Sequence, residues 1–277
     1  MILVTGATGK VGRSVVSQLL DEGQQVRVLT RHPARAAFPG EVDVVAGDLG
    51  QPGTLPAAIE GTQRAFLFPV HGRLHAFLDL ARGSRLDRVV LLSSAAVTMP
   101  HPNAIARVHL DSEHVTASAG LPWTFVRPTA FMANDLAWAP AIKSHGVVRA
   151  PYGKAVTVPI DERDIAAVAV SALLHDGHAG RSYTITGPEP FTQIDRVYQL
   201  AGVLQRPLHF EEQAPGEFRQ QMSTMPAHVT DSLLELLASR VDATPEITDT
   251  VQQVTGRPPR TYRQWAAHHA TDFSKTP

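Results

Sequence analysis

Cysteine is absent from this chain of 277 residues. Without a thiol, the protein can form no disulfide, no thiolate metal centre and no cysteine nucleophile. A surplus of positive charge is missing too, because 25 Lys and Arg residues are balanced by 26 Asp and Glu residues and the net charge is -1. A protein that binds nucleic acid needs a basic face to contact phosphates, so we expect no nucleic-acid partner.

Long hydrophobic runs are also missing. The longest apolar stretch, residues 165–174, is too short to span a bilayer, so we expect no membrane partner. With 43% hydrophobic and 18% charged residues, the chain can bury a core, and its length suits one large α/β domain or a core with an appended lobe. The first residues already read as a strand, which leaves no room for a signal sequence and predicts a cytoplasmic protein.

The start of the chain holds the most informative pattern. Residues 1–5 are a short apolar run, Gly6, Gly9 and Gly12 follow it, and residues 14–20 read as a helix. This order is typical of a dinucleotide site, because backbone N–H groups and the helix dipole favour a pyrophosphate. We expect Gly6 to permit the tight turn, Gly9 to let the backbone approach the phosphates, and Gly12 to let the helix pack on the sheet. The alternative is a generic strand-to-helix turn.

The end of the second predicted strand, residues 25–30, indicates which pyridine nucleotide binds. NAD sites usually have an acidic residue there, which accepts hydrogen bonds from the ribose hydroxyls. This chain has Arg31 instead, and Arg35 follows one helical turn later. A guanidinium binds a 2′-phosphate that a carboxylate would repel, so we expect NADP(H) rather than NAD(H). The alternative is that Arg31 is an ordinary surface residue.

Further short apolar runs alternate with helical patterns along the chain. The runs that we interpret as strands are residues 42–46, 65–68, 88–92, 123–126, 156–160 and 182–187. Nearly continuous apolar strands separated by helices predict an α/β protein with a Rossmann-like, doubly wound parallel sheet flanked by helices. We assign this core to residues 1–187, with an excursion over the site at residues 135–155. Residues 188–277 are expected to form a small, mostly helical C-terminal lobe.

Several motifs occur in an order that is more specific than any one of them. They are Val4-Thr5-Gly6-Ala7-Thr8-Gly9-Lys10-Val11-Gly12, Leu29-Thr30-Arg31, Gly47-Asp48-Leu49, Asp164-Ile165-Ala166, and the stretches 120–134, 183–189 and 255–261. In this order the chain resembles the NmrA-like branch of the atypical short-chain dehydrogenase/reductase family over nearly its whole length. That resemblance implies a Rossmann-like core with NADP(H) at the glycine turn. The family includes NAD(P)H quinone and dye reductases, isoflavone-reductase-like enzymes and cofactor-sensing regulators that catalyse nothing.

The resemblance also implies roles for residues along the cofactor. Gly6, Thr8, Gly9, Lys10, Val11 and Gly12 would contact the pyrophosphate region, Arg31 and Arg35 the 2′-phosphate, Asp48 and Leu49 the adenine, Phe68 and Pro69 the length of the cofactor, and Pro128 and Phe131 the nicotinamide.

The catalytic pair of ordinary short-chain dehydrogenases, Tyr-x-x-x-Lys, is missing from the helix predicted at residues 104–119. His109 and Glu113 stand there at i and i+4, so Glu113 could orient a protonated His109 that gives a proton to the reduced substrate. The alternative is a solvated helix pair. Because the hydride comes from the cofactor, the protein may need only to position and desolvate its substrate.

Four residues are candidates for substrate contacts. Ala95 follows a predicted strand, and the apolar side chains of Phe131, Met132 and Tyr152 either line a substrate pocket or pack the lobe against the core. Both interpretations stay open for these residues.

The tail of the chain holds two polar clusters. His268 and His269 stand side by side there, and we expect no metal site at them. Arg257, Arg260 and Arg263 form a basic patch that we interpret as a solvated face.

Two functions follow from these patterns. The first is an NADPH-dependent oxidoreductase that transfers hydride to a small, aromatic or quinonoid, organic substrate. The alternative is a non-catalytic protein of the NmrA-like type that senses NADP(H), which the missing Tyr-Lys pair favours. A third, weaker function is that of an isomerase or dehydratase that borrows hydride. The sequence leaves a monomer and a homodimer open.

Overall fold

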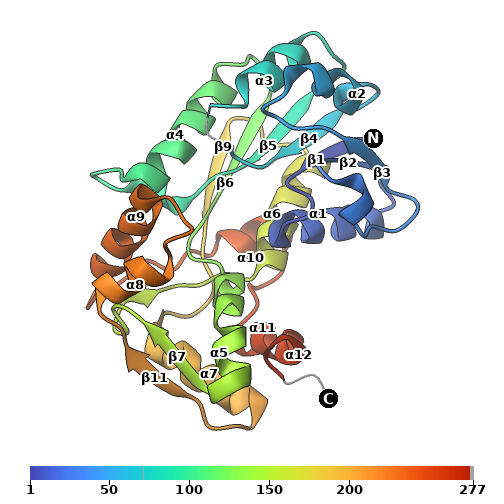
Figure 1. Ribbon diagram of the computed structural model, residues 1–277. Coiled ribbons are helices and arrows are strands. Elements are labelled where there is room, and N and C mark those ends of the chain that lie inside the picture. Colours follow the sequence, from blue (N-terminus) through green and yellow to red (C-terminus); the bar gives the residue numbers. More distant parts are fainter. Residues whose placement is uncertain (71, 275–277) are drawn as a thin grey trace.

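Among residues 1–70 and 72–274, which the computed structural model describes, seven parallel strands form one central sheet (Figure 1). In spatial order these strands are β3 (Asp43–Ala46), β2 (Val26–Thr30), β1 (Ile2–Thr5), β4 (Arg64–Leu67), β5 (Arg88–Leu92), β6 (Trp123–Pro128) and β9 (Arg181–Ile185).

The strand order reverses between β1 and β4. From β1 the chain builds outward to β3, and it then returns to the other side of β1 to add β4, β5 and β6. In open parallel sheets, ligands bind beyond the carboxyl ends of the strands at such a reversal. The predicted Rossmann-like, doubly wound sheet is confirmed, and its binding crevice is expected at the ends of β1 and β4.

Helices cover both faces of the sheet, and each face has its own apolar core. Ile2 and Val4 of β1 belong to one core, and Leu3 between them belongs to the other, because successive side chains of a strand point to opposite faces. The first core is completed by α1 (Lys10–Asp21), α6 (Glu162–Leu174) and α10 (Thr250–Thr255). The second core is completed by α2 (Leu55–Ile59) and α3 (His75–Arg82), with α4 (Ala104–Ala117) on the same face.

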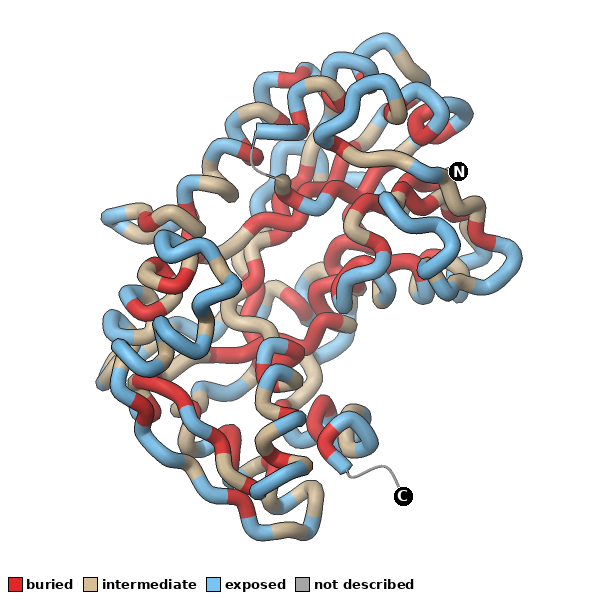
Figure 2. Tube along the Cα trace, viewed as in Figure 1, coloured by how far each residue is buried: buried red, intermediate tan, exposed pale blue. Residues whose placement is uncertain are grey.

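A third apolar core lies below the sheet in the view of Figure 1. Its largest fully buried side chains are Trp265 and Tyr262. Figure 2 shows that buried residues occur in both this region and the central sheet. The elements that contribute to the third core are η4 (Met132–Trp138), α5 (Ala139–His145), β7 (Val147–Ala150), α7 (Gln193–Leu204), β10 (Phe191–Thr192), β11 (His209–Glu212), α11 (Tyr262–His268) and α12 (Ala270–Phe273).

The remaining elements are short or peripheral. The helix α9 packs against α4 and α8, and so it links the tail of the chain to the sheet. The bounds of these elements are η1 (Pro33–Arg35), η2 (Pro52–Thr54), η3 (Ala95–Thr98), β8 (Val156–Thr157), α8 (Pro215–Gln221) and α9 (Ala227–Ala238). None of the helices in the described part of the chain is long and apolar enough to cross a membrane.

Two sequence predictions need correction or comment. The strand predicted at residues 156–160 is shortened to β8, which pairs with β10 outside the central sheet, while Ile160 forms a single bridge with Phe131. The packing also crosses the predicted boundary at residue 187, because Val251 belongs to the first core and residues 132–150 contribute to the third. Residues 275–277 of the predicted lobe lie outside the described residues. The two-part division itself stays a prediction.

Candidate functional site

The glycine turn between β1 and α1 has the shape that the sequence predicts. Gly6 has φ +62°, a left-handed backbone conformation that a side chain would strain. A Cβ placed on Gly12 would lie 2.3 Å from the backbone oxygen of Gly6, so the first turn of α1 touches the loop before it. The tight turn and the close packing are therefore confirmed at Gly6 and Gly12.

The N-terminus of α1 is open to an anion. Gly9 is the N-cap residue, no described side chain caps the helix, and its first turn holds no acidic residue. The N–H groups at a helix start carry partial positive charge and need acceptors. The residues present thus fit a phosphate bridge, and Lys10 adds a positive side chain at the same end.

The arginines after β2 are exposed and unengaged. The side chains of Arg31 and Arg35 make no hydrogen bond or ion pair with any described residue. Arg13 is held differently, because its Nη1 donates to the carbonyl oxygen of Ala37 at 3.1 Å and its guanidinium lies 5.2 Å from the ring centre of Phe38. Two guanidinium groups at the end of β2 are therefore available to a ligand.

The loop after β3 is fixed by its own side chains. The Asp48 carboxylate accepts from the N–H of Gly50 at 2.8 Å and lies 3.6 Å from Nη1 of Arg73. Leu49 is 7% exposed and packs into the second core. The predicted adenine contacts of Asp48 and Leu49 stay predictions.

The ends of β1 and β4 are tied together at the point where the strand order reverses. The N–H of Phe68 donates to Oγ1 of Thr5 at 2.8 Å, and that hydroxyl donates to the carbonyl oxygen of Phe66. The Phe68 side chain packs over Gly6, where an added Cβ would come within 2.6 Å of it, yet it is 44% exposed. An exposed aromatic ring beside the glycine turn is placed to contact a ligand there, while Pro69 next to it is buried.

A group of polar side chains meets at the ends of β5 and β6. Oγ of Ser93 donates to Oε1 of Glu113 at 2.5 Å. Arg127 forms a two-pronged ion pair with the same carboxylate, from Nε to Oε1 at 2.8 Å and from Nη2 to Oε2 at 2.6 Å. The side chain of Glu113 is 7% exposed and that of Arg127 is 22% exposed. We call these three residues the Ser93–Glu113–Arg127 cluster.

His109 lies one helical turn before Glu113 on α4. The helix α4 starts beyond the carboxyl edge of the sheet and runs back along the sheet. Four residues of helix rise about 6 Å, so His109 lies about 6 Å further from the strand ends than Glu113 does. Nδ1 of His109 is buried and finds no hydrogen-bond partner among the described residues. This partly buried imidazole therefore has one ring nitrogen that is left unsatisfied.

The predicted relationship between His109 and Glu113 needs correction. The Glu113 carboxylate is occupied by Arg127 and Ser93, so it does not hold His109 by a hydrogen bond. Burial lowers the pKa of His109 from its ordinary value, and the charge of Glu113 opposes this only in part. His109 is thus neutral at pH 7, whereas the sequence pattern predicted a protonated side chain. The buried Glu113 also excludes the solvated pair that was the alternative.

The other predicted contact residues are spread over two regions. Pro128 is buried in β6, and Ala95 and Phe131 are partly buried near the ends of β5 and β6. Met132 is 1% exposed and packs in the third core, which favours the packing role over the substrate contact among the two interpretations left open for it. Tyr152 lies in the turn after β7 with φ +58°, and its N–H donates to Oε1 of Glu212 at 2.6 Å. Its contact with a substrate stays a prediction.

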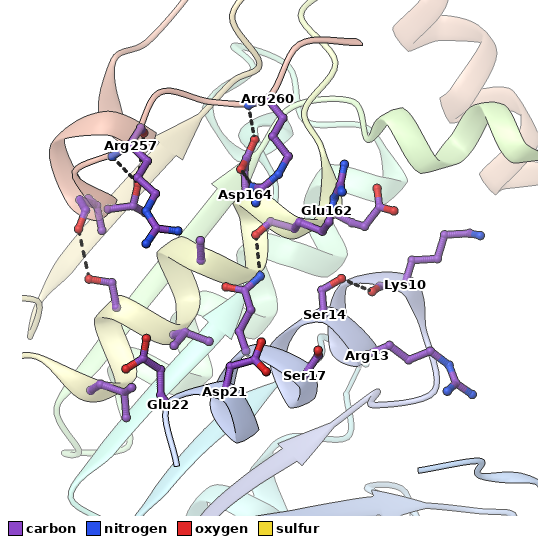
Figure 3. Close-up of a pocket in the computed structure, with 18 of the residues that line it drawn as sticks. Lys10, Arg13, Ser14, Ser17, Asp21, Glu22, Glu162, Asp164, Arg257 and Arg260 are labelled. Atoms are coloured by element: carbon purple, nitrogen blue, oxygen red, sulfur yellow. Dashed lines mark hydrogen bonds and ion pairs between the residues drawn. The ribbon is translucent and has the colours of Figure 1, made fainter. Parts of the chain in front are cut away.

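A large hollow in the described structure lies along the helices. It has a volume of about 990 Å³ and runs between α1, α6 and the segment from α10 to α11. Figure 3 shows Ser14, Ser17 and Asp21 on α1 along one side and Arg257 and Arg260 on the other. This hollow is open to solvent and runs along the helices, whereas the expected binding crevice lies at the ends of β1 and β4. The hollow is therefore not the expected cofactor site.

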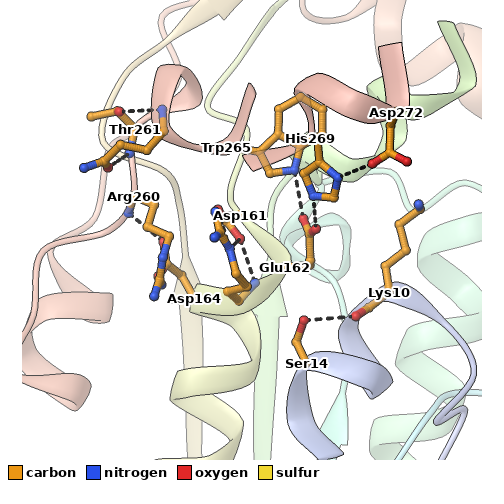
Figure 4. A network of polar contacts seen from close by, with 12 residues as sticks. Lys10, Ser14, Asp161, Glu162, Asp164, Arg260, Thr261, Trp265, His269 and Asp272 are labelled. Atoms are coloured by element: carbon orange, nitrogen blue, oxygen red, sulfur yellow. Dashed lines mark hydrogen bonds and ion pairs between the residues drawn. The ribbon is translucent and has the colours of Figure 1, made fainter. Parts of the chain in front are cut away.

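Carboxylates at the start of α6 bind the tail of the chain (Figure 4). Asp164 accepts from the N–H of Arg260 at 2.6 Å and pairs with its guanidinium. Glu162 accepts from Nε1 of Trp265 at 3.2 Å and lies 2.9 Å from Nε2 of His269. Burial raises the pKa of Asp164, and the contacts of Arg260 oppose that change. The interpretation of Arg260 as a merely solvated residue is therefore wrong.

Comparison with known proteins gives this geometry a family. A family model described as NAD(P)H-binding matches residues 6–176. The chain belongs to the NAD(P)H-binding family. The matched range begins at Gly6 of the glycine turn, and it includes β2, α4 and the start of α6.

Two relatives cover nearly the whole chain. A (4-alkanoyl-5-oxo-2,5-dihydrofuran-3-yl)methyl phosphate reductase from Streptomyces griseus is 42% identical over 99% of this chain and 99% of its own length. An NAD(P)H azoreductase from Xenophilus azovorans is 34% identical, again over 99% of each chain. The crystal structure of an NADPH-dependent quinone oxidoreductase from Escherichia coli, complexed with NADPH, has a TM-score of 0.81 at 23% identity and covers 97% of this chain and 99% of that chain. That likeness shows the fold.

These findings identify the chain as an NAD(P)H-dependent oxidoreductase that acts on a small organic molecule. The open start of α1 at the glycine turn fits a nucleotide phosphate, and β4, β5 and β6 follow one another on the other side of β1 from β2. The missing Tyr-Lys pair favoured a non-catalytic sensor, but the relatives that cover nearly the whole chain are reductases, which favours the enzyme.

Proposed function

We propose that this enzyme uses NADPH to reduce a conjugated, electron-poor acceptor, which includes aromatic and quinonoid molecules. The activities of the relatives support this choice. An alkanoyl-oxo-dihydrofuran, an azo compound and a quinone are all conjugated systems that accept a hydride at one end and collect negative charge on oxygen or nitrogen at the other. The chemistry that these acceptors share is thus more informative than any single substrate.

The cofactor is proposed to bind along the carboxyl ends of the strands. The turn at Gly6, Gly9 and Gly12 would hold the pyrophosphate on the open start of α1. Arg31 and Arg35 would hold the 2′-phosphate, and this is the basis for proposing NADPH over NADH. The bound nicotinamide supplies the hydride, and the protein residues have to place and stabilise the acceptor.

His109 is proposed to contact the acceptor atom on which charge develops. A neutral imidazole donates a hydrogen bond without giving up its proton, and it stabilises a developing oxyanion in that way. The single observation that supports this role most directly is the buried, unpartnered Nδ1 of His109 beside the strand ends. After hydride transfer, the electron pair on the acceptor oxygen takes a proton from solvent, so no side chain has to change its protonation state.

The experiment is a spectrophotometric assay of NADPH oxidation with three acceptor classes: a 2-acylbutenolide, a quinone and an azo dye. We expect acceptor-dependent oxidation with at least one class, a rate that is higher with NADPH than with NADH, and no reaction with an isolated ketone. Absence of turnover with all conjugated acceptors, measured on protein that binds NADPH by calorimetry, would contradict the proposal.

A further inference from the structure

The Ser93–Glu113–Arg127 cluster joins three elements that do not adjoin in the sequence. Ser93 directly follows β5, and Arg127 lies in β6. They stand two residues after Leu91 and Phe125 and so lie on the same face of the sheet as these two side chains. Glu113 of α4 contacts both Ser93 and Arg127. Ser93 also donates its N–H to the carbonyl oxygen of Val126 at 2.7 Å. The cluster thus fixes the position of α4 along its axis relative to the ends of β5 and β6.

The cluster also contains a charge that would otherwise act on His109. Glu113 is 5% exposed, and a carboxylate that is buried without a partner binds a proton or raises the proton affinity of its neighbours. Of the described residues, Glu113 is the one whose charge is resolved as raising the pKa of His109. Arg127 lies against the same carboxylate with two short contacts. Arg127 and Ser93 therefore hold the Glu113 carboxylate in position, and Arg127 places a positive charge directly against it.

Charges on the other elements packed against α4 have different partners. The short helix η3 consists of Ala95, Ala96, Val97 and Thr98 and has no charged group. On α9, Asp231 is paired with Arg219 at 2.7 Å and Glu235 is exposed. From β6 the charged group is Arg127 itself. α9 also carries His228, and α4 itself carries Arg107, Asp111 and His114, but Glu113 is the charge that raises the pKa of His109.

We propose that Arg127 is a positioning residue for the reductase reaction, because it neutralises Glu113 and so keeps the neighbouring His109 neutral and free to donate to the acceptor. The inference rests on the proposed function of His109. Ser93 completes the arrangement by holding the free lone pair of Oε1. Arg127 acts through Glu113 and does not itself contact the acceptor.

The consequence of losing Arg127 follows from charge balance. In Arg127→Gln the Glu113 carboxylate stays buried next to His109 without its cation, so the pair of side chains retains a proton to higher pH. A protonated His109 forms an ion pair with Glu113 and turns away from its role as a neutral donor. Removing both charges in the double variant Glu113→Gln/Arg127→Gln takes away the cause and restores the neutral imidazole.

The test combines two readouts on purified full-length enzyme. The first is the pH profile of kcat with saturating NADPH, and the second is the NMR titration of the His109 ring, assigned by comparison with His109→Ala. In Arg127→Gln we expect kcat at pH 7 to fall roughly tenfold and the acid limb of the profile to move up by about one pH unit. The KM for NADPH should stay within about twofold. Arg127→Lys should shift the limb less.

Two further variants keep the test decisive. The double variant should return the acid limb to the wild-type position even if it is less stable, whereas a purely structural role for Arg127 predicts that it is at least as impaired as the single variant. Arg88→Gln is the matched control, because Arg88 sits at the opposite end of β5, is paired with Asp176 at 2.7 Å, and should leave the pH profile unchanged.

The outcomes separate this inference from the proposed function. An unchanged ring titration and an unchanged pH profile in folded Arg127→Gln would overturn the inference. If His109→Ala keeps full turnover while the His109 ring still titrates at higher pH in Arg127→Gln, the electrostatic coupling stands and the proposed role of His109 fails. If the double variant does not recover, the charge argument is wrong.

Discussion

The two halves of the site are built from different material. The half at β1 and α1 is made of backbone, with Gly6 and Gly12 chosen for the side chains they lack. The half at β5, α4 and β6 is made of side chains, with a buried carboxylate that three hydrogen bonds hold in place. The first half is the proposed site of the nucleotide, and the second half is the proposed site of the substrate.

This difference determines what each half tolerates. A backbone site has no charge to remove but cannot accept added volume, because the atoms around Gly12 are backbone atoms of the same turn. A side-chain site can accept a new shape but not an unbalanced charge, because Glu113 is buried. We therefore expect volume changes to dominate in the first half and charge changes to dominate in the second.

The largest effect is expected from adding volume at Gly12. In Gly12→Val the first added carbon would already overlap the Gly6 oxygen at 2.3 Å, so the turn has to move away from the phosphates. We expect kcat/KM for NADPH to fall about 1,000-fold, because overpacking and misplaced N–H groups act together. The same substitution at exposed Gly202 in α7 meets no atom within 4 Å and should keep wild-type kinetics. Equal kinetics for both variants would show that the turn does not hold the cofactor.

The next effect is expected from His109→Ala in the side-chain half. Loss of one donor to a developing oxyanion should lower kcat about 100-fold. The Kd for NADPH, measured by calorimetry, should stay unchanged because the turn at α1 is untouched. His109→Gln keeps an N–H donor and should recover part of the rate. Full turnover in the alanine variant would reduce His109 to a structural residue.

A smaller effect is expected from reversing one charge in the backbone half. Arg31→Asp replaces the proposed partner of the 2′-phosphate by a repelling group, and a charge-assisted hydrogen bond of this kind corresponds to roughly a 30-fold change in affinity. We expect NADPH binding to weaken by that factor while NADH binding changes little. A matched reversal at Arg35 should have the same sign. Equal losses for both nucleotides would place the 2′-phosphate elsewhere.

The smallest effect concerns stability and pH. Burial lowers the pKa of His109 in the fold, so the unfolded chain binds a proton more readily than the folded one. The contribution of neutral His109 to the free energy of unfolding is fully present above the ordinary histidine pKa of about 6.5. It is lost as the pH falls through the lower pKa that His109 has in the folded protein. The free energy of unfolding, measured with urea at pH 7.5 and pH 5.5, should therefore fall more between these two pH values in wild type than in His109→Ala. His178 and His268, whose pKa values burial also lowers, act the same way in both proteins.

Most of the fold could be predicted from the sequence, because strand and helix patterns are local. The runs at residues 88–92 and 182–187 correspond to β5 and β9. Asp161 caps α6 by accepting from the N–H of Arg163 at 2.8 Å, a local contact of the kind that an Asp before a helix usually makes. The pairing of β8 with β10 was not predictable in this way. It depends on contacts between residues that are far apart in the chain.

The two halves of the site also differ in how far the sequence alone reveals them. The glycine turn is contiguous, so its spacing reveals it. The Ser93–Glu113–Arg127 cluster was missed because its members come from three elements, and the sequence offers only a weak signal: Ser93 and Arg127 each follow an apolar strand run that ends at the same edge. Sequence spacing on α4 therefore suggested His109 as the partner of Glu113, whereas the fold supplies Arg127 from the neighbouring strand.

The network at the start of α6 has a consequence for how the protein is made. Asp164 and Glu162 are 3% and 5% exposed, and their partners Arg260, Trp265 and His269 stand 96 to 107 residues later in the chain. Until those residues emerge from the ribosome, α6 cannot bury its acidic end without unbalanced charge, although every strand of the central sheet has already been synthesised. The packing of α6 on α1 therefore reaches its final form only after residues 260–269 have been added.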